Sequence, residues 1–523
     1  MKLENEIILG SVAISDANLI LEGIITGDVQ GESSFYWQNQ AELYPVTVST
    51  DGNNFVCRLL LQPVMQLRCV CQTGAAKLVT LKLRVGKMFP LAASLKHAYY
   101  SAHGFVLKRM DNCLLLRQTA KVLPAELRLL LELAASCKLS AWKAVFLRSF
   151  YHLRRLFNPR TFWLVSDRPD RADDNGEAFF TYAVTQVQDR DVYFLLRKDS
   201  VDYPRLSKIG KVIPYGSLRH KIYQLMADVI ITSGGSLEFM LAAFNKEYYK
   251  DILFKQKRVF LQHGVTQCNY SAWLNKYEKN FSFFITTTPQ EQAAILRENY
   301  FYDESVVRLT GFARYDFLQS RPGKIICIMP SWRGNLINLQ LYNRNGTCEP
   351  VAGFSESAFF KFYNGLLNDA RLLAALQKYG YQLKFVLHPN MRAFSDVFTK
   401  NALVKFVTTQ ERYRDLINEG SMVVTDYSSV AFDFAYLNKP VLYCQFDREE
   451  YTHWRFYHQG YFDYETAGLG EVVTTLDAAV DRLIGYMING CIMKPCYRER
   501  VAKTFAYRDR QNCQRIYEAI ANL

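Results

Sequence analysis

The feature that most constrains the fold is an alternation of short apolar strands with helical segments from Thr161 onward. The segments "TFWLVSD", "DVIITSGG" and "FSFFITTT" are typical strands, and segments with helical periodicity separate them. Such alternation indicates parallel strands joined by crossover helices. After residues 315–324 the pattern starts again with the strand "KIICIMPSWRG" and one helix of more than twenty residues, "SAFFKFYNGLLNDARLLAALQKYG". We therefore expect an α/β fold with two Rossmann-like domains, in residues 161–318 and 319–523.

Two further regions precede this pair. Residues 1–122 contain short β-branched and aromatic runs punctuated by Gly, Asn, Asp and Pro, which predicts a small antiparallel β-sandwich. Residues 123–160 have a helical period and form a predicted basic amphipathic linker, in which Trp142, Phe146 and Phe157 alternate with Arg148 and Arg154. The helix 139–157 could lie in a membrane interface, or it could pack on the core with its basic residues in solvent.

The overall charge narrows the class of partner. A net charge of +13 and a pI of about 9.0 favour anionic partners such as nucleotides, phosphorylated polymers or an acidic membrane face. The basic residues form no strip interleaved with aromatics, so we expect no nucleic acid partner. The chain has no apolar stretch of transmembrane length and no signal-peptide pattern, and its twelve cysteines lack zinc spacing. These features predict a cytoplasmic protein with reduced thiols.

Four of the predicted strands end in polar residues. Ligands of open α/β sheets bind at the carboxyl ends of strands, so these ends are the candidate site. The motifs are "LQHGV", "MPSWRG", "VLHPN" and "VVTDYSS", and their candidate residues are His263, Gly264, Ser331, Trp332, Arg333, His388, Pro389, Asn390, Thr425, Asp426, Tyr427, Ser428 and Ser429.

The residue types in these motifs suit phosphate chemistry. Ser428 and Ser429 begin a predicted helix whose first amides lack partners, which favours a diphosphate; the alternative is that one serine only caps the helix. His263 and His388 come from different domains and could face each other, one taking a proton and the other stabilising a leaving phosphate. Arg314 and Arg333 can donate to phosphate oxygens in pairs.

With these residues gathered, the chain resembles the CDP-glycerol glycerophosphotransferase family of teichoic acid and capsule polymerases. The matching segments are "QHGVTQ", "TGFARYD", "MPSWRG", "VLHPN" and "VTDYSSVAFDFAYLNKPVLY", within residues 160–475. The segment "SDRPDRADDNGEAFFTYAV" also resembles the entry strand and helix of the family's transferase region. The resemblance implies a GT-B fold and transfer of glycerol phosphate from CDP-glycerol to a hydroxyl of a cell-wall or capsular polymer, with release of CMP. It implies His263 as the base, His388 at the donor phosphate and Ser428 and Ser429 at the diphosphate.

The resemblance also points to further site residues and to the partners. Asp433 in "DYSSVAFDF" and Asp463 in "GYFDYE" are further candidate residues. The donor would be CDP-glycerol, or CDP-ribitol, as a substrate, with no tightly bound cofactor and no metal. The acceptor would be an anionic or lipid-linked polymer, and the protein would be peripheral on the inner face of the cell membrane.

Two other functions remain open on the sequence. A GT-B glycosyltransferase that uses a nucleotide sugar would have the same architecture, because a fold does not fix its chemistry. A non-catalytic polymer-binding subunit of the same assembly is the alternative from another class.

Overall fold

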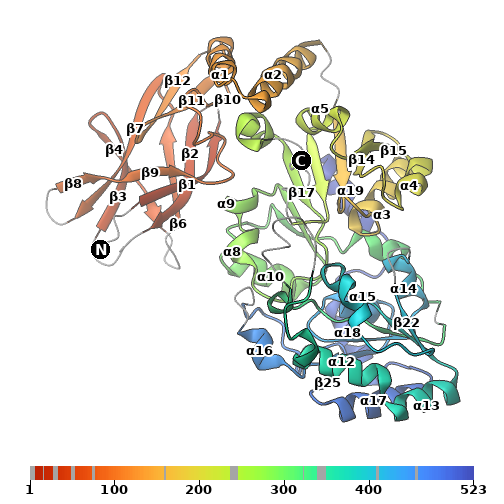
Figure 1. Ribbon diagram of the computed structural model, residues 1–523. Helices are drawn as coiled ribbons and strands as arrows, with labels where there is room; N and C mark the ends of the chain where they lie inside the picture. The colour runs from red at the N-terminus through yellow and green to blue at the C-terminus, as the bar shows by residue number, and fades with distance from the viewer. Residues whose placement is uncertain are drawn as a thin grey trace.

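In the residues that it describes, the computed structural model contains four β-sheets, two in an N-terminal sandwich and two in separate Rossmann-like lobes (Figure 1). The residues it describes are 6–15, 17–26, 33–48, 54–73, 77–119, 121–157, 161–235, 245–321, 323–337, 349–407, 411–453 and 458–523. Residues 158–160, where the sequence predicts the end of the linker, lie outside this part of the chain.

The N-terminal sandwich packs two sheets around one core that includes Trp37 and Phe55. In β2 every second residue is buried, as expected for a strand with one face on a core. The predicted antiparallel pairing is confirmed, except that β1 and β9 pair in parallel. One sheet, ordered β5-β6-β2-β1-β9, comprises β1 (Glu6–Ile14), β2 (Asn18–Thr26), β5 (Thr47–Val48), β6 (Asn54–Leu60) and β9 (Lys82–Val85). The other comprises β3 (Ser33–Asn39), β4 (Glu42–Pro45), β7 (Val64–Thr73), β8 (Lys77–Thr80), β10 (Tyr99–Ala102), β11 (Phe105–Met110) and β12 (Cys113–Gln118).

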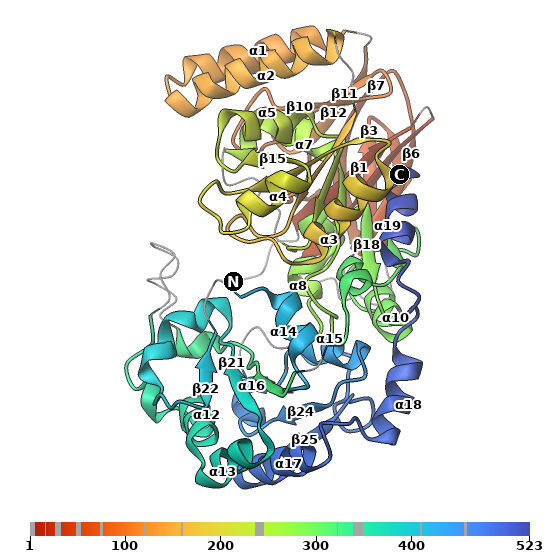
Figure 2. The same ribbon diagram turned by 90° about the vertical axis from the view of Figure 1, so that its right-hand side faces the viewer.

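Two helices, α1 (Leu123–Ala135) and α2 (Leu139–Phe157), follow the sandwich and lie at one end of the molecule (Figure 2). The buried residues of α2 are Ala141, Ala144, Leu147 and Arg148, and Arg148 is fully buried. Arg148 donates to Glu126 of α1 and to Asp251 at distances of 2.6–2.9 Å. The expectation that the basic residues of this helix face solvent is therefore wrong for Arg148, because two buried carboxylates compensate its charge.

The first lobe is a seven-stranded parallel sheet in the order β15-β14-β13-β16-β17-β18-β19. The strands are β13 (Phe162–Ser166), β14 (Asp191–Leu196), β15 (Lys211–Pro214), β16 (Val229–Thr232), β17 (Lys257–Phe260), β18 (Phe283–Thr286) and β19 (Val307–Leu309). The helices that accompany them include α3 (Asn175–Tyr182), α4 (Tyr203–Ile209), α5 (Leu218–Met226), α7 (Lys250–Phe254), α8 (Ser271–Leu274), α9 (Lys276–Lys279), α10 (Pro289–Arg297) and the 3-10 helix η3 (Ala313–Phe317).

The second lobe is a six-stranded parallel sheet in the order β22-β21-β20-β23-β24-β25, which is the Rossmann order. Its strands are β20 (Ile325–Ile328), β21 (Gln382–Phe385), β22 (Val404–Phe406), β23 (Met422–Thr425), β24 (Val441–Cys444) and β25 (Glu471–Val473). Helical segments here include α12 (Ala358–Asn368), α13 (Ala370–Tyr379), η6 (Pro389–Val397), α14 (Tyr413–Glu419), α15 (Val430–Tyr436), α16 (Arg448–Thr452), α17 (Leu476–Ile488), α18 (Pro495–Thr504) and α19 (Asn512–Ala521). The predicted α/β fold class is thus confirmed.

One long predicted helix is in fact two. Asp369 separates α12 from α13, with backbone angles of φ −65° and ψ 124° that no α-helix contains. Its side chain accepts hydrogen bonds from the amides of Arg371 and Leu372, so it caps α13. The apolar period continues across the break, which is why the sequence pattern alone predicted one helix.

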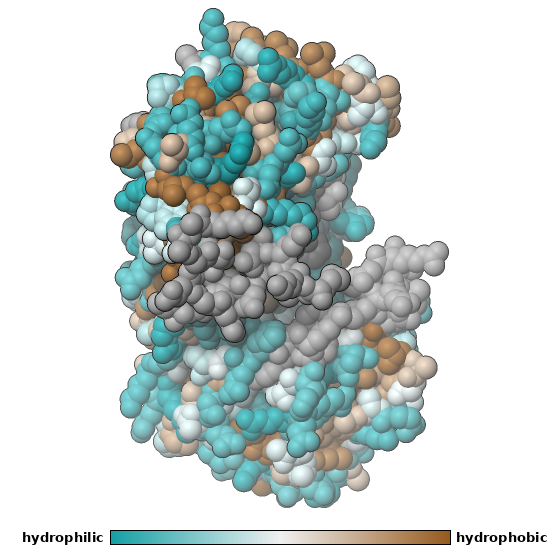
Figure 3. All heavy atoms as spheres, turned by 90° about the vertical axis from the view of Figure 1, so that its left-hand side faces the viewer, coloured by the Kyte–Doolittle hydropathy of each residue, from teal (hydrophilic) through white to brown (hydrophobic). Residues whose placement is uncertain are grey.

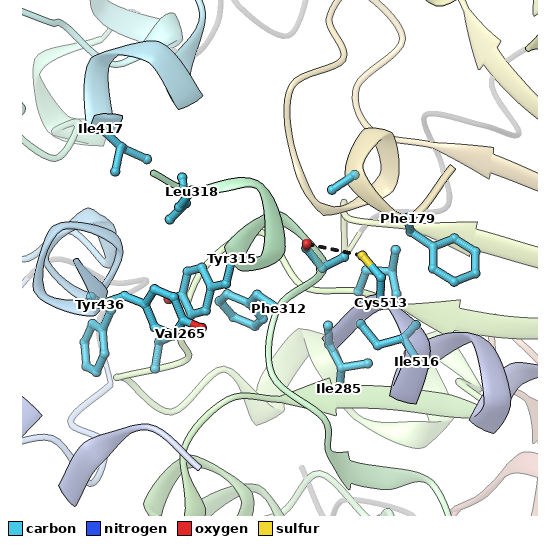
Figure 4. Close-up of a cluster of buried hydrophobic side chains, with 14 of the residues drawn as sticks. Phe179, Val265, Ile285, Phe312, Tyr315, Leu318, Ile417, Tyr436, Cys513 and Ile516 are labelled. Atoms are coloured by element: carbon cyan, nitrogen blue, oxygen red, sulfur yellow. Dashed lines mark hydrogen bonds between the residues drawn. The ribbon is translucent and has the colours of Figure 1, made fainter. Parts of the chain in front are cut away.

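The C-terminal helix returns to the first lobe. Figure 4 shows Cys513 and Ile516 of α19 in a cluster of buried hydrophobic side chains, and Cys513 Sγ donates to the carbonyl oxygen of Ala313 at 3.3 Å. Tyr517 of the same helix packs against Trp163 of β13, with ring centroids 5.0 Å apart. The division at residues 318/319 stays a prediction, but the last helix of the chain packs against the lobe that precedes this division.

Candidate functional site

A cavity of about 220 Å³ lies between the two lobes. Its walls come from segments that follow β13, β17 and β19 in the first lobe and β20 to β23 in the second. In each lobe these are the carboxyl ends of parallel strands, where ligands bind. Of the residues predicted from the sequence, those that line the cavity are His263, Arg314, His388, Pro389, Ser428, Ser429 and Asp433.

His263 lies in the loop after β17, with its side chain 75% exposed. Its Nδ1 lies 2.6 Å from Oδ2 of Asp174. The negative charge of Asp174 raises the pKa of His263 above its ordinary value. Because the carboxylate occupies Nδ1, Nε2 is the ring nitrogen that remains for a substrate.

Asp174 is itself held in place. It caps α3 by accepting from the amide of Asn175, and Arg314 Nη1 donates to it at 2.9 Å. Arg314 also donates to the carbonyl oxygen of His263 at 2.9 Å and to Asp433 at 2.7 Å. Burial opposes the charge of Asp174, but His263 and Arg314 outweigh it and lower the pKa of this carboxyl. Arg314, bound to two carboxylates, thus fixes the loop that carries His263.

His388 follows β21 and lines the same cavity from the second lobe. Its Nδ1 accepts a hydrogen bond from the amide of Asn390 at 3.2 Å, and Trp332 stacks on the ring with centroids 6.0 Å apart. Burial, and next the charge of His263 and that of Arg168, lower the pKa of His388 to about 3. The ring is therefore neutral near pH 7 and carries its proton on Nε2, where it can donate.

The two lobes meet closely beside these histidines. A Cβ atom on Gly264 would lie 2.0 Å from Oγ of Ser429, so only glycine allows this approach. Ser429 occupies the N-cap position of α15 without a side-chain capping bond. Ser428 Oγ accepts from the amide of Val430 at 3.3 Å, so the capping alternative applies to Ser428.

Arg333 lies outside the cavity wall and is only 4% exposed. It donates to Asp426 at 2.9 Å and to Asp447 at 2.8 Å, and the amide of Ser331 donates to the same Asp426. These bonds tie the loop after β20 to the loops after β23 and β24. We therefore do not assign phosphate binding to Arg333, since carboxylates already occupy its guanidinium group.

Three of the remaining predicted residues form hydrogen bonds that stabilise loops. Thr425 Oγ1 donates to the carbonyl oxygen of Met329, Tyr427 donates to Asp447, and exposed Asp463 accepts from the amide of Thr466. The predicted residues that do not line the cavity are Gly264, Ser331, Trp332, Arg333, Asn390, Thr425, Asp426, Tyr427 and Asp463.

Several polar residues of the cavity were not among the sequence predictions. They are Asp167, Arg168, Asp170, Arg171, Asp173, Asp174, Arg392, Glu411 and Tyr413. Most belong to "SDRPDRADDN", residues 166–175, directly after the first strand of the first lobe. Its position at a strand end is a signal that could have found Asp174. Within the described ranges, no group of three or more His, Cys, Asp or Glu residues could hold a metal ion.

Known proteins resemble this chain in sequence and in fold. The chain is 39% identical over 382 residues to the minor teichoic acid biosynthesis protein GgaB of Bacillus subtilis (strain 168), covering 73% of this chain and 42% of GgaB. It is 27% identical over 172 residues to the teichoic acid poly(ribitol-phosphate) polymerase of Bacillus spizizenii, covering 32% of this chain and 24% of that protein. The chain thus spans less than half the length of these relatives.

Solved structures share the fold. The wall teichoic acid polymerase TagF superposes with a TM-score of 0.54 at 16% identity, over 76% of this chain and 96% of TagF. A family model described as CDP-Glycerol:Poly(glycerophosphate) glycerophosphotransferase matches residues 147–522, most of the chain. The chain therefore belongs to the CDP-glycerol:poly(glycerophosphate) glycerophosphotransferase family.

Proposed function

We propose that this protein transfers a polyol phosphate from a CDP-activated donor to a hydroxyl group of a cell-wall polymer and releases CMP. The observation that carries the proposal is the pair of histidines on one cavity, one bound to a carboxylate and the other neutral. Family membership supports a CDP-polyol as the donor, and the similarity to GgaB supports a teichoic acid as the acceptor.

In this mechanism His263 is the general base. Its Nε2 takes the proton of the acceptor hydroxyl as the oxygen attacks the β-phosphorus of the donor. The new bond joins the acceptor oxygen to phosphorus. The bond from phosphorus to the bridging oxygen breaks, and CMP leaves with the electron pair. Asp174 stabilises the imidazolium that forms, and Arg314 keeps Asp174 in position.

The second lobe stabilises the departing charge. His388 is neutral and has a proton on Nε2 to donate to a phosphate oxygen. Ser428 and Ser429 line the same cavity, and we assign their hydroxyls to the diphosphate. Fixed donors of this kind add to the rate because they need no reorganisation as the charge develops.

The donor is CDP-glycerol or CDP-ribitol. The family description names a glycerophosphotransferase, and one relative is named a poly(ribitol-phosphate) polymerase, so both polyols are chemically reasonable. The acceptor is an anionic or lipid-linked polymer.

We also propose that the protein works as a peripheral protein on the inner face of the cell membrane. Trp142 and Phe146 of α2 are 54% and 58% exposed, and with Lys143 they border a cavity of about 630 Å³ that is mostly apolar. Figure 3 shows apolar side chains among hydrophilic ones at the end of the molecule that carries α1 and α2. Aromatic side chains beside lysine suit the boundary between acyl chains and anionic headgroups. None of the described helices is both long enough and apolar enough to cross a bilayer.

The test is CMP release by the purified protein, with a teichoic acid polymer as acceptor and CDP-glycerol, CDP-ribitol and nucleotide sugars as donors. We expect release from a CDP-polyol, and a loss of about 100-fold or more in His263→Ala. His97→Ala, in the N-terminal sandwich, is the control.

Two results would contradict the proposal. Nucleotide release from a nucleotide sugar alone would indicate a glycosyltransferase. No release from any donor, together with binding of the polymer, would indicate a non-catalytic binding subunit.

A further inference from the structure

Three arginine side chains on the cavity wall have no role in the mechanism above. Arg168 and Arg171 follow β13 in the first lobe, and Arg392 lies in η6 of the second lobe. They line the same cavity as His263 and His388. We call these three residues the arginine cluster.

Burial and the positive charges of the arginine cluster lower the pKa of Arg392 and that of His388. Burial, and then the charges of Arg171 and Arg168, lower the pKa of Arg392. Arg168 and Arg392 both contribute to the low pKa of His388, so they lie close to that ring. Positive charges that line one cavity from both lobes favour an anion between them.

Two of the three arginines of the cluster each pair with one carboxylate. Asp170 pairs with Arg168 at the surface, and Asp202 pairs with Arg171, both at 3.1 Å. Glu411 is bound by Lys384 at 2.9 Å and by a second lysine.

Arg392 is the member with an unused donor, its Nε. Among the described residues no carboxylate lies within ion-pair distance of it, and its Nε is buried without a hydrogen-bond partner. A buried donor of this kind costs free energy until a ligand satisfies it.

Arg314 and Arg333 differ from the arginine cluster in the number of carboxylates that bind them. Each of those two guanidinium groups is bound by two carboxylates, so neither has free charge for a phosphate. We propose that the arginine cluster, rather than Arg314 or Arg333, is the subsite that binds a phosphate group of the substrate beside the two histidines. This inference rests on the proposed function, because it names how that site holds its substrate.

Two substrate groups have the required chemistry, the diphosphate of the CDP-polyol and the terminal phosphodiester of the acceptor polymer. Arginine suits both, because its planar fork donates to two phosphate oxygens at once. The cluster takes residues from both lobes, so a bound phosphate would also bridge the lobes.

The experiment uses the full chain with Arg392→Gln and Arg168→Gln. The control is Arg308→Gln, an exposed arginine on β19 outside the cavity. Calorimetric titration measures the Kd of CDP-glycerol, CMP and inorganic pyrophosphate, and kinetics measure the KM of the acceptor polymer. Arg171 is left intact because its pair with Asp202 supports the loop.

We expect each variant to lose about tenfold or more in affinity, the effect of one charge-assisted hydrogen bond. A weaker Kd for CDP-glycerol and pyrophosphate, but not for CMP, would assign the cluster to the donor diphosphate. An unchanged donor Kd with a tenfold higher acceptor KM would assign it to the acceptor. Values within twofold of the control in both measurements, at an unchanged melting temperature, would overturn the inference.

Failure of this inference is distinguishable from failure of the proposed function. His263→Ala should bind CDP-glycerol normally and lose turnover. If no CDP-polyol is turned over by the unaltered protein, the function is wrong. In that case weaker binding of pyrophosphate or of the polymer by Arg392→Gln would still support the subsite, and unchanged binding of both would refute it.

Discussion

At the scale of single residues, the site depends on which charges already have partners. His263 and His388 each follow the carboxyl end of a strand, yet their surroundings shift their pKa values in opposite directions. Asp174 raises the pKa of His263, while burial lowers that of His388 to about 3. The environment thus separates a base from a neutral donor, as acid–base pairs in enzymes require.

The first prediction concerns Asp174→Asn. The raised pKa means that His263 is protonated, and inactive as a base, at any pH well below that pKa. Removing the charge should lower the pKa, so the acid limb of the kcat/KM profile for CMP release should move to lower pH. The plateau should fall by about 100-fold, because the ring is no longer oriented.

The control for this prediction is Asp199→Asn, which removes only an exposed pair with Arg197. An acid limb that stays where it is in Asp174→Asn would show that Asp174 does not tune the base.

At the scale of elements, α2 is the helix whose buried face differs most from what its sequence pattern suggests. The sequence predicts the helix correctly at 139–157. It does not predict which face packs, since Arg148 is buried while Trp142 and Phe146 are exposed. Helical periodicity identifies an amphipathic helix, but the partners of each face lie elsewhere in the chain.

The second prediction follows from the buried charge of α2. Arg148→Met leaves Glu126 and Asp251 without their cation in a buried site. We expect a loss of about 3 kcal/mol in unfolding free energy. Urea unfolding of the variant tests this, with the exposed Arg154→Met as the matched control. An unchanged midpoint would mean that the two carboxylates find other partners.

The third prediction concerns the outward face of α2. The double variant Trp142→Ser, Phe146→Ser should bind vesicles of anionic lipid at least about tenfold more weakly, since each aromatic ring buries apolar area in the interface. Co-sedimentation with vesicles measures this. Leu60→Ser combined with Val64→Ser removes exposed apolar side chains from the sandwich and should have no effect. Equal binding by all three proteins would refute the membrane role of α2.

At the scale of the whole molecule, the site exists only because the two lobes meet. Gly264 of the first lobe approaches Ser429 of the second, and Arg314 of the first binds Asp433 of the second. The C-terminal helix α19 further ties the lobes, because the chain returns to pack on β13.

The fourth prediction tests this contact. Gly264→Ala places a methyl group 2.0 Å from Ser429 Oγ, so the lobes or the loop must move. We expect kcat/KM to fall by about tenfold or more, as reacting groups lose their alignment, with little change in melting temperature. Gly485→Ala on α17 meets nothing within 4 Å and is the control. Full activity in Gly264→Ala would mean that the approach is not needed.

The sequence by itself determined the order of strands and helices, the α/β class, the family and the two histidine motifs. These depend on local periodicity and on residues that are close in the chain. The sequence did not predict the helix break at Asp369, because a capping residue does not interrupt the apolar period.

Only the tertiary structure decided which charged residues are free. Arg314 and Asp433 are 119 residues apart in sequence, and Arg333 and Asp447 are 114 apart, so no local pattern shows that these arginines are already paired. The same holds for Arg148 and Asp251, which are 103 apart. A guanidinium group has the same sequence signature whether a carboxylate or a substrate phosphate binds it, and only the folded chain determines which of these anions lies within reach.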